Sequence, residues 1–577
     1  MGPLKAPAAS TPPLRQLTRL RERLGPLPIV NWFLERLGID EILARHVPPG
    51  LDPRTKIQPS KALGVLLRSI LVEREPVYRQ QEAVETFCPS AFGLSAVEVQ
   101  ALSDDAVGRA LDRLFTAGGN ALVTACVVNA RRGFGLALRE LHNDSTSVRF
   151  CGQYRRAKGR SVRGHKAPWI TYGYSKDHRP DLKQLLMTLT ASADGMVPVH
   201  LRTDDGNTND STTHIETWQA LCELHGTPSF LYVADSKLCS QGAMEEIDKR
   251  GGKFVTVLPR SRREDQHFRE WIQEKEPAWE KVWDRPNPRR KYGPRDVWYV
   301  HKAMVPSREN WPVVWVYSTL LRIHQEKRRQ EHILRATQEL ERLKAKLEGP
   351  RPRRRSERQI EEQIARIVSR LHVRDYVRAW VFEKQVERFR QEKPGRPGAQ
   401  TRYLRTVRTR PSIAWEIDLR TIEYDKKSDG MYPLLTNDRS LSLRQVLEAH
   451  KRQSGLERRF RQAKSVHEIA PVFLHNEGRI VALFLLYFVA LLVQALIERE
   501  IRAAMKKTGI KQLPLYPEER LCKQPTAHGI FRLFTFIDRE KVFENSKLIG
   551  EFEPELTDLQ KQVLGLLGVP MSAYLAR

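Results

Sequence analysis

The sequence predicts an α/β protein. A mixed sheet with helices on both faces follows an all-helical N-terminal domain and is interrupted by a long insertion. Apolar residues recur at three- and four-residue spacing over residues 24–133, which is typical of amphipathic helices. Strand-like segments rich in apolar and β-branched residues begin at Arg139. The stretch between Asp235 and Glu457 is too long for a connection within one sheet, so we expect it to contain an inserted domain.

Composition limits the class of protein. The 577 residues include 97 Lys and Arg against 69 Asp and Glu, a formal net charge of +28 at pH 7, and 40% are hydrophobic. This apolar content can bury several cores, which excludes a small single module and a disordered chain. The positive charge attracts polyanions, and nucleic acid is therefore the leading candidate partner. A ribosome-associated or simply soluble basic protein would have the same charge.

Cysteines and apolar runs indicate the compartment. The six cysteines lie far apart without a C-x-x-C pair, which argues against a zinc ribbon or a disulfide framework and fits a reducing cytoplasm. The proline-rich N-terminus lacks an apolar core, so we expect a loose tail rather than a signal peptide. Residues 480–493 form an unbroken apolar run that is short for a membrane span. We expect a helix buried inside the protein and no membrane association, with a lone membrane anchor as the alternative.

The N-terminal helical domain has three amphipathic stretches: IVNWFLERLGIDEILARHV, KALGVLLRSILVERE and DAVGRALDRLFTAGGNALVTACVV. Ser103 precedes the third stretch and is a candidate N-cap. No helix-turn-helix is recognisable, so the domain could bind DNA, dimerise or only pack.

The sheet is predicted from strands of two kinds. LHNDSTSVRF and the apolar segments on either side of the SADG turn at residues 192–195 predict an antiparallel meander of three strands. Residues 230–234 are apolar on both faces, which is typical of a strand covered by helices on either side. A helix with a glycine stop and a second buried strand at residues 254–258 follow. This strand–helix–strand unit should cross over right-handed into a parallel pair.

The insertion combines strands with charged helices. Tryptophan-rich strand candidates occur at residues 297–300 and 311–317. Two runs with heptad-like apolar spacing, from Ile333 to Leu347 and from Ile360 to Leu371, then predict an antiparallel helical hairpin. KPGRPGA is expected to be a linker, after which a strand near MYPLL returns to the sheet and a long helix begins near Ser442. The predicted domains are a flexible tail (1–23), a helical N-terminal domain (24–135), a core that contains the sheet (136–260 and 426–500), an insertion (261–425) and a C-terminal helical region (501–577).

Two aspartates are candidates for a metal site. Asp144 lies in a predicted strand, and Asp235 follows a buried strand, where open sheets place ligand sites. Two carboxylates at neighbouring strand ends could share a divalent cation, because Mg²⁺ prefers oxygen ligands and leaves positions for water and phosphate. Considered alone, each Asp is more commonly a cap or turn residue.

A third candidate lies on a predicted helix. His450, Gln453, Glu457, Phe460 and Lys464 follow one another at spacings of three and four residues and therefore share one helical stripe. An acid at Glu457 could complete the metal site while Lys464 contacts phosphate. A solvated basic helix with an ordinary intrahelical pair is the alternative. The arginines around the stripe are Arg452, Arg458, Arg459 and Arg461, and of these Arg452, Arg458 and Arg461 are candidate DNA-binding residues together with Lys464.

Four motifs in this order resemble the DDE transposases of bacterial insertion sequences. They most resemble the Y-R-E-K branch (insertion sequence four superfamily), which has a large insertion between the second Asp and the Glu. LHNDSTSVRF resembles the first-Asp strand of that family, and FLYVADSKLCS resembles the second-Asp strand. DGMVPVHLRTDDGNTND resembles the hairpin between them, and LERRFRQAKS followed by PVFLHNEGRIVALFLLYFVALL resembles the C-terminal signature. The resemblance covers roughly residues 141–500.

The resemblance implies an RNase-H-like catalytic fold in which Asp144, Asp235 and Glu457 hold two Mg²⁺ (or Mn²⁺) ions. One ion would activate water or a DNA 3′-hydroxyl, and the other would stabilise the leaving 3′-oxygen. Lys464 would contact a DNA phosphate near the scissile bond. Relatives excise an element at its terminal inverted repeats and insert it into target DNA, acting as a homodimer in the synaptic complex. A catalytically silent DNA-binding descendant and an RNase-H-fold nuclease without strand transfer remain as alternatives.

The sequence also departs from the family pattern. The Tyr and Arg of the Y-R-E-K motif fall on His450 and Gln453, with Arg452 beside the latter, so a phosphate contact is expected to have moved or been lost. Gly455 stands where relatives often carry tryptophan and costs a helix up to ~1 kcal/mol relative to alanine. His142 is expected to be an ordinary strand residue rather than a metal ligand.

Insertions in relatives help to grip the DNA end. A basic cluster between the two predicted helices would suit contact with the DNA backbone, or would simply be a solvated loop tip. Its members are Arg351, Arg353, Arg354 and Arg355.

Overall fold

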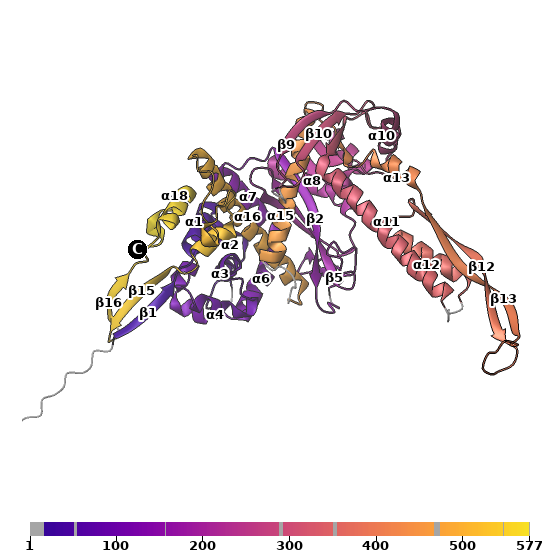
Figure 1. The fold of residues 1–577 in the computed structure, drawn as a ribbon. Coiled ribbons are helices and arrows are strands. Elements are labelled where there is room, and N and C mark those ends of the chain that lie inside the picture. The colour runs from indigo at the N-terminus through magenta and orange to yellow at the C-terminus, as the bar shows by residue number, and fades with distance from the viewer. Residues whose placement is uncertain are drawn as a thin grey trace, which may run out of the picture. The chain divides into compact units, whose positions relative to one another are not determined.

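A computed structural model shows two structural units (Figure 1). Unit 1 comprises Met1–Thr256 and Ala449–Arg577, and unit 2 comprises Val257–Glu448. Unit 1 is therefore built from two separate stretches of sequence. The residues that the structure describes are 17–50, 55–155, 157–287, 292–349, 355–466, 474–545 and 547–575.

Helices form the N-terminal part of unit 1, as the apolar spacing predicts. Ser103 caps one of them, because its side chain accepts a hydrogen bond from the backbone N–H of Ala106 at 3.2 Å. The helices are α1 (Leu27–Leu37), α2 (Ile39–His46), α3 (Pro59–Val72), α4 (Gln80–Glu85), α5 (Ala96–Gln100), α6 (Asp104–Ala117) and α7 (Gly119–Phe134).

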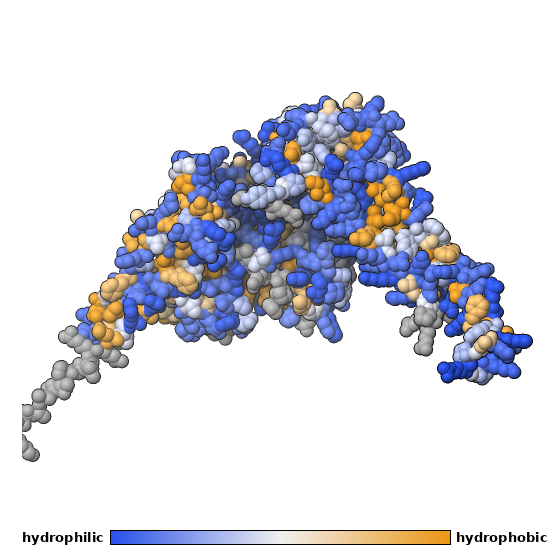
Figure 2. Space-filling model, viewed as in Figure 1, coloured by the Kyte–Doolittle hydropathy of each residue, from blue (hydrophilic) through white to orange (hydrophobic). Residues whose placement is uncertain are grey.

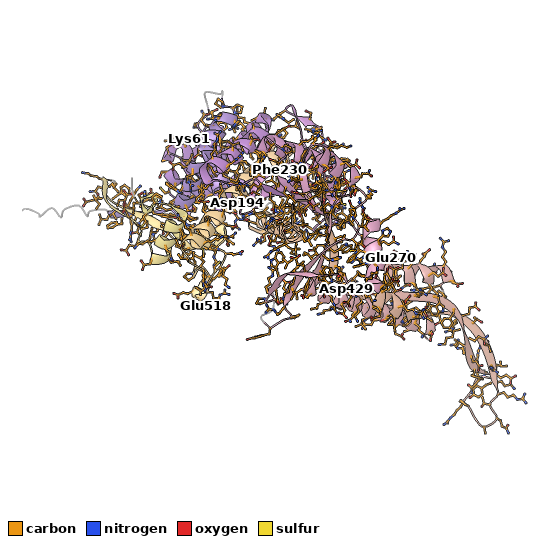
Figure 3. All side chains as sticks on the ribbon, turned by 90° about the horizontal axis from the view of Figure 1, so that it is seen from above. Lys61, Asp194, Phe230, Glu270, Asp429 and Glu518 are labelled. Atoms are coloured by element: carbon orange, nitrogen blue, oxygen red, sulfur yellow. The ribbon has the colours of Figure 1, made fainter. Side chains whose placement is uncertain are left out.

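Helix α16 (Glu477–Lys507) forms the core of unit 1 and contacts α1, α3, α6 and α7. By length and composition it could cross a membrane, but 89% of its most apolar window is buried in the protein. The apolar run at residues 480–493 is thus a buried core helix, as predicted. An ion pair of 2.8 Å joins Arg499 of α16 to Asp194, which is labelled in Figure 3.

The sheet of unit 1 is mixed. Its strands lie in the order β6-β5-β2-β7-β8, with β2, β5 and β6 forming the predicted antiparallel meander. Strand β7 runs parallel to β2 and β8 runs parallel to β7, as predicted for the strand–helix–strand unit. The elements are β2 (Glu140–Phe150), β5 (Lys183–Ser192), β6 (Val197–Asp204), α8 (His214–His225), β7 (Leu231–Ala234), α9 (Gln241–Lys249) and β8 (Lys253–Val257), with a small hairpin of β3 (Ser161–Val162) and β4 (His165–Lys166).

Two predictions about the ends of the chain are wrong. The expected tail of residues 1–23 contains β1 (Leu17–Arg23), which pairs antiparallel with β15 (Asp538–Glu544), while residues 1–16 lie outside the described part. The C-terminal region is not all helical, since β16 (Lys547–Phe552) pairs with β15 beside α17 (Ala527–Leu533) and α18 (Asp558–Leu567). The sequence of β1 shows no alternation of apolar and polar residues that would predict a strand. Charged pairs across the strands, such as Lys541 with Glu22 at 3.0 Å, align it with its distant partner.

Unit 2 contains four antiparallel strands, which lie side by side in the order β14-β11-β10-β9. The predicted tryptophan-rich strands are β10 and β11, and Trp315 of β11 stacks on Phe268 of α10 with ring centroids 3.6 Å apart. The elements are α10 (Arg263–Glu274), β9 (Glu280–Arg285), β10 (Asp296–Lys302), β11 (Val313–Ser318), α13 (Leu419–Lys426) and β14 (Met431–Thr436).

Two helices and a long ribbon complete unit 2. Helices α11 (Thr319–Glu348) and α12 (Glu357–Arg370) lie where the heptad-like spacing predicts them and share an apolar cluster that includes Leu340 and Ile364. Of the predicted basic cluster, only Arg355 lies within the described residues, and Arg351, Arg353 and Arg354 lie outside them.

The predicted linker KPGRPGA is instead part of the hairpin loop between β12 (Val377–Gln391) and β13 (Tyr403–Ile417). Hairpin loops and linkers share a Gly- and Pro-rich composition. Both faces of these strands are mostly exposed, so the sequence has no alternation of apolar and polar residues that would predict a hairpin.

Replacing Phe488 with alanine tests the role of α16. Phe488 is 1% exposed, so Phe488→Ala should lower the free energy of unfolding of unit 1 by about 3–5 kcal/mol through the cavity that it leaves. Urea titration followed by circular dichroism measures this change. Lys506→Ala, at an exposed position of the same helix, should change it by less than about 0.5 kcal/mol. A loss below about 1 kcal/mol for Phe488→Ala would contradict a tightly packed core helix.

Candidate active site

The register of β2 and β7 brings two aspartates together. The parallel pairing of these strands ends with Asn143 opposite Ala234. Asp144 and Asp235 are the next residue on each strand, so they lie side by side where the pairing stops. The structure therefore brings together two of the three predicted metal ligands, both within unit 1.

Burial and neighbouring charges act on the carboxyl group of Asp144. Burial raises the pKa of Asp144 to about 6, and the negative charges of Asp235 and Asp210 act in the same direction. The ammonium group of Lys176 and the backbone N–H of Ser145, which donates to Asp144 Oδ1 at 2.7 Å, act against this rise. Three carboxylates and one lysine thus share one site.

Lys176 holds the positive charge of this site. Its Nζ donates to both the backbone oxygen and Oγ of Ser145, each at 2.7 Å. It pairs with Asp210 Oδ2 at 2.9 Å and lies 3.8 Å from Asp144 Oδ1. The ammonium group therefore offsets two carboxylates that would otherwise repel each other.

Asp235 is fixed by its neighbours. Its side chain accepts a hydrogen bond from the backbone N–H of Lys237 at 3.0 Å. Asp235 therefore also caps a short turn, which is the common role of an aspartate considered alone. Its backbone oxygen accepts a hydrogen bond of 2.6 Å from Thr256 Oγ1 of β8. These bonds hold the end of β7 in place beside Asp144.

A buried histidine lies close to the acidic residues. Nδ1 of His214 is 3.1 Å from the hydroxyl of Tyr232, while its Nε2 has no hydrogen-bond partner among the described residues. Burial lowers the pKa of His214 to about 4, although Asp235 and Asp210 act in the opposite direction. His214 is therefore neutral at physiological pH.

Helix α15 (Ser454–Arg461) is anchored beside β2 at its N-terminal end. The side chain of Gln453 donates to the backbone oxygen of Asn143 at 2.8 Å and contacts Nδ1 of His142 at 2.9 Å. His142 also contacts Glu140 through Nε2, so it is a hydrogen-bonded strand residue, as expected. Gln453 thus fixes the helix next to Asp144.

The other anchor of α15 is the turn between β5 and β6. Arg459 donates to the backbone oxygens of Gly195 and Met196 and forms a buried ion pair of 2.8 Å with Glu498 of α16. A Cβ atom at Gly455 would come within 2.6 Å of the Met196 side chain. Glycine therefore lets the helix approach this turn closely, which explains the apparent break in the helical pattern.

Glu457 is one helical turn beyond Gln453 and is exposed. Further along the chain, Lys464 pairs with Asp177 at 2.7 Å, and Asp177 follows Lys176. The segment from Gln453 to Lys464 thus runs past the site with Glu457 between two fixed points. In the described ranges, however, no group of three or more His, Cys, Asp or Glu side chains is placed to hold a metal ion. The structure does not bring Glu457 into a ligating group with Asp144 and Asp235.

The predicted DNA-binding arginines differ in their surroundings. Arg452 forms two hydrogen bonds with the carboxylate of Glu140, at 2.6 and 2.7 Å. Burial opposes ionisation of Glu140, but the bonds from His142 and Arg452 outweigh it and lower the pKa of Glu140 to about 2. Arg452 is thus engaged inside the protein, and its contact with DNA stays a prediction. Arg458 and Arg461 are exposed and form no ion pair with a described residue.

Sequence reasoning missed three residues of the site. Asp210 ends the GNTND segment of a recognised motif, which was the one available signal for it. Lys176 lies in an irregular segment before β5, and His214 begins α8. No local sequence pattern predicts that Lys176 or His214 belongs to the site. Both residues reach the strand ends only through the folding of the segments that contain them.

The donor set suits a hard divalent cation. Asp144 and Asp235 offer carboxylate oxygens, which are the ligands that Mg²⁺ and Mn²⁺ prefer. Asp210 is instead the ion-pair partner of Lys176, whose ammonium group also lies 3.8 Å from Asp144. Asp144 and Asp235 therefore fit a metal ion, whereas Glu457 would have to move towards them.

Residues 21–128 match the model of DUF4277, a domain of unknown function, and correspond to most of the helical N-terminal part. None of the curated proteins compared with this chain matches it. A solved structure of a piggyBac transposase synaptic complex with hairpin DNA is similar over 84% of this chain and 77% of that chain, with 9% sequence identity and a TM-score of 0.34. A TM-score this low does not establish a shared fold.

Removing the charge of Lys176 should raise the pKa of Asp144 further. In Lys176→Met the carboxylate loses its nearest cation, so protonation becomes more favourable and the pKa should rise above about 6. Titration of the carboxyl carbon resonance of Asp144 in selectively labelled, metal-free protein measures this pKa. Lys183→Met, which removes a lysine that contacts Gln153, should leave it near 6. An unchanged pKa in Lys176→Met would disprove the coupling.

Loss of Arg459 should destabilise unit 1. Arg459→Ala leaves the carboxylate of Glu498 buried without this partner, which should lower the free energy of unfolding by about 3–5 kcal/mol. The neighbouring exposed residue offers a matched control, since Arg458→Ala should change it by less than about 0.5 kcal/mol. Urea unfolding of both variants measures these free energies. Equal free energies of unfolding for Arg459→Ala and Arg458→Ala would rule out Arg459 as an anchor of α15.

Proposed function

We propose that this protein is a metal-dependent DDE transposase that cleaves and joins DNA at the ends of a bacterial insertion sequence. The observation that carries the proposal is that Asp144 and Asp235 directly follow the last register pair of β2 and β7, which brings the two carboxylates close together. The four motifs that resemble the Y-R-E-K branch support the same function. The mixed sheet, with its meander followed by parallel strands, is compatible with an RNase-H-like core.

The proposed cofactor is a pair of Mg²⁺ (or Mn²⁺) ions. Asp144 and Asp235 would hold them, and Glu457 would join when α15 moves closer to the strand ends. Bound metal would activate the attacking oxygen and stabilise the leaving 3′-oxygen of the phosphodiester. Two features favour a bound cation: Asp144 is buried, which disfavours its charged form, and the negative charge of Asp235 acts in the same direction, so a positive charge between them would stabilise both carboxylates.

Other residues would bind and orient the DNA. Arg458 and Arg461 are exposed on α15 and would contact phosphates of the backbone. Lys464 would exchange its partner Asp177 for a phosphate near the scissile bond. Arg452 would act mainly by fixing Glu140 and His142 beneath the helix. The substrates would be the terminal inverted repeats and target DNA, bound by a homodimer in the bacterial cytoplasm.

A second candidate is a catalytically silent, transposase-derived DNA-binding protein. The position of Glu457, outside any ligating group of the described residues, favours this alternative. It retains the basic charge and the motifs but requires no metal. Catalysis therefore separates the two candidates, whereas DNA binding does not.

Substitution of the paired aspartates tests the proposal. Loss of a direct metal ligand should reduce cleavage by more than the 10- to 100-fold typical of groups outside the metal shell. Asp235→Asn and Asp144→Asn should therefore lower cleavage of DNA carrying the inverted repeats by more than about 100-fold, while DNA affinity is kept. Glu457→Gln should have the same effect if this side chain completes the site.

Asp181→Asn is the matched control, because Asp181 is exposed and pairs with Arg179. A labelled 3′-end that becomes joined to target DNA identifies strand transfer, and cleavage without joined product would indicate a nuclease. Wild-type protein that binds the repeats but never cuts them, with or without Mn²⁺, would leave the silent DNA-binding protein as the function.

A further inference from the structure

Strands β12 and β13 of unit 2 form a ribbon that extends beyond the helices that support its base (Figure 1). At the base, Val377 and Ile413 are buried in the apolar cluster of α11 and α12. The last contacts with α11 and its C-terminal end are the ion pair of Lys384 with Glu348 at 2.6 Å and a hydrogen bond from Arg410 to the backbone oxygen of Gly349. Nearly all of the residues 385–409 beyond these contacts are exposed.

The two faces of the ribbon differ in charge. Residues paired across antiparallel strands share a face, and the pairs of Lys384 with Arg410 and Val386 with Arg408 define one of them. This face has no acidic side chain between Lys384 and Gln391 or between Tyr403 and Arg410. Its basic residues, which we call the basic face, are Lys384, Arg388, Arg390, Arg408 and Arg410.

The opposite face is nearly neutral. There Glu387 pairs with Arg405, and the aromatic rings of Phe389 and Tyr403 are exposed. Figure 2 shows the ribbon surface as mostly hydrophilic with hydrophobic side chains between, and Figure 3 shows side chains projecting to both sides of it. The separation of charge therefore results from the register of the two strands and not from composition alone.

Three guanidinium groups of the basic face lack a compensating charge. Arg388, Arg390 and Arg408 form no ion pair with any described residue, in contrast to Arg405 on the other face. A two-stranded hairpin is only marginally stable in water, and this one presents adjacent like charges on one side. A polyanion that binds this side would remove the repulsion and supply the missing partners.

We propose that the basic face of the ribbon enters the major groove of duplex DNA. A two-stranded ribbon fits this groove, which is about 12 Å wide. Residues on one face recur about every 6.8 Å along each strand, so successive arginines can reach phosphates on the groove walls. The inference extends the proposed function by naming the contact with duplex DNA, but it does not depend on catalysis.

Other partners fit this surface less well. The major groove of duplex RNA is deep and narrow, so the ribbon cannot enter it. A second copy of the chain would bring two positively charged faces together, which is electrostatically unfavourable. Both partners are outcomes of the experiment below.

The test uses the full-length protein with Arg388, Arg390 and Arg408 replaced together by alanine. Its affinity for a 20-base-pair DNA duplex of arbitrary sequence is measured by fluorescence anisotropy at several salt concentrations. Loss of two or three phosphate contacts should lower the affinity at least about 10-fold and reduce the slope of log K against log salt by about 2–3. Circular dichroism of the variant should match that of the wild type.

The matched control replaces Arg358, Arg366 and Arg370 of α12 by alanine. Their side chains are 87%, 80% and 62% exposed, and the change in net charge is the same within the same unit. This control should change the DNA affinity by less than about threefold, because these arginines lie outside the basic face and already pair with Glu362 or Glu339. The loss of such exposed ion pairs has little effect on stability. A duplex whose major groove is filled by glucosylated hydroxymethylcytosine should bind wild type and ribbon variant equally.

Three results would overturn the proposal. Unchanged DNA affinity in the ribbon variant excludes the contact, and an equal loss on duplex RNA shows general attraction to polyanions. A shift in sedimentation coefficient at unchanged DNA affinity would assign the face to a second copy of the chain. The proposed function fails separately, because Asp235→Asn tests cleavage without altering the ribbon.

Discussion

The parallel pairing of β2 with β7 is the constraint on which the candidate site depends. It ends with Asn143 opposite Ala234 and thereby forces two carboxylates into one small volume. Burial of Asp144 is the main cause of its raised pKa, and the negative charge of Asp235 adds to it, so a positive charge beside the two carboxylates is favourable. Lys176 supplies part of the compensation in the structure described, and a metal ion would supply more. The mixed sheet, the helices around it and the anchored α15 all serve to hold this edge in place.

Much of unit 1 could be predicted because its elements have local signatures. The apolar residues 230–234 predict a buried strand and therefore place Asp235 at a strand end, and the SADG turn predicts the meander that contains Asp144. The apolar run of α16 was recognised as a core helix for the same reason. In these cases the number and spacing of apolar residues within a short window decide the structure.

The remainder depends on contacts between residues far apart in the sequence. Strand β1 is stabilised by a partner more than 500 residues away, and β12 and β13 have polar residues on both faces, so neither shows a local pattern. Lys176 and Asp210 reach the site through irregular loops. The departures at Gln453 and Gly455 gain meaning only from the strand and turn that they touch. How close Glu457 comes to the two aspartates depends on how α15 packs, which the spacing of residues along a helix cannot determine.

Unit 1 is assembled from two stretches of sequence with the whole of unit 2 between them. Its N-terminal helices therefore cannot acquire their central helix until α16 has been synthesised. At about 5–20 residues per second, the ribosome needs tens of seconds to reach that point. During this interval the nascent N-terminal part must expose apolar surface that α16 later covers, which makes it a client for chaperones. Chains terminated before Ser454 would lack both α15 and α16, so they could neither complete the core nor anchor a helix beside β2.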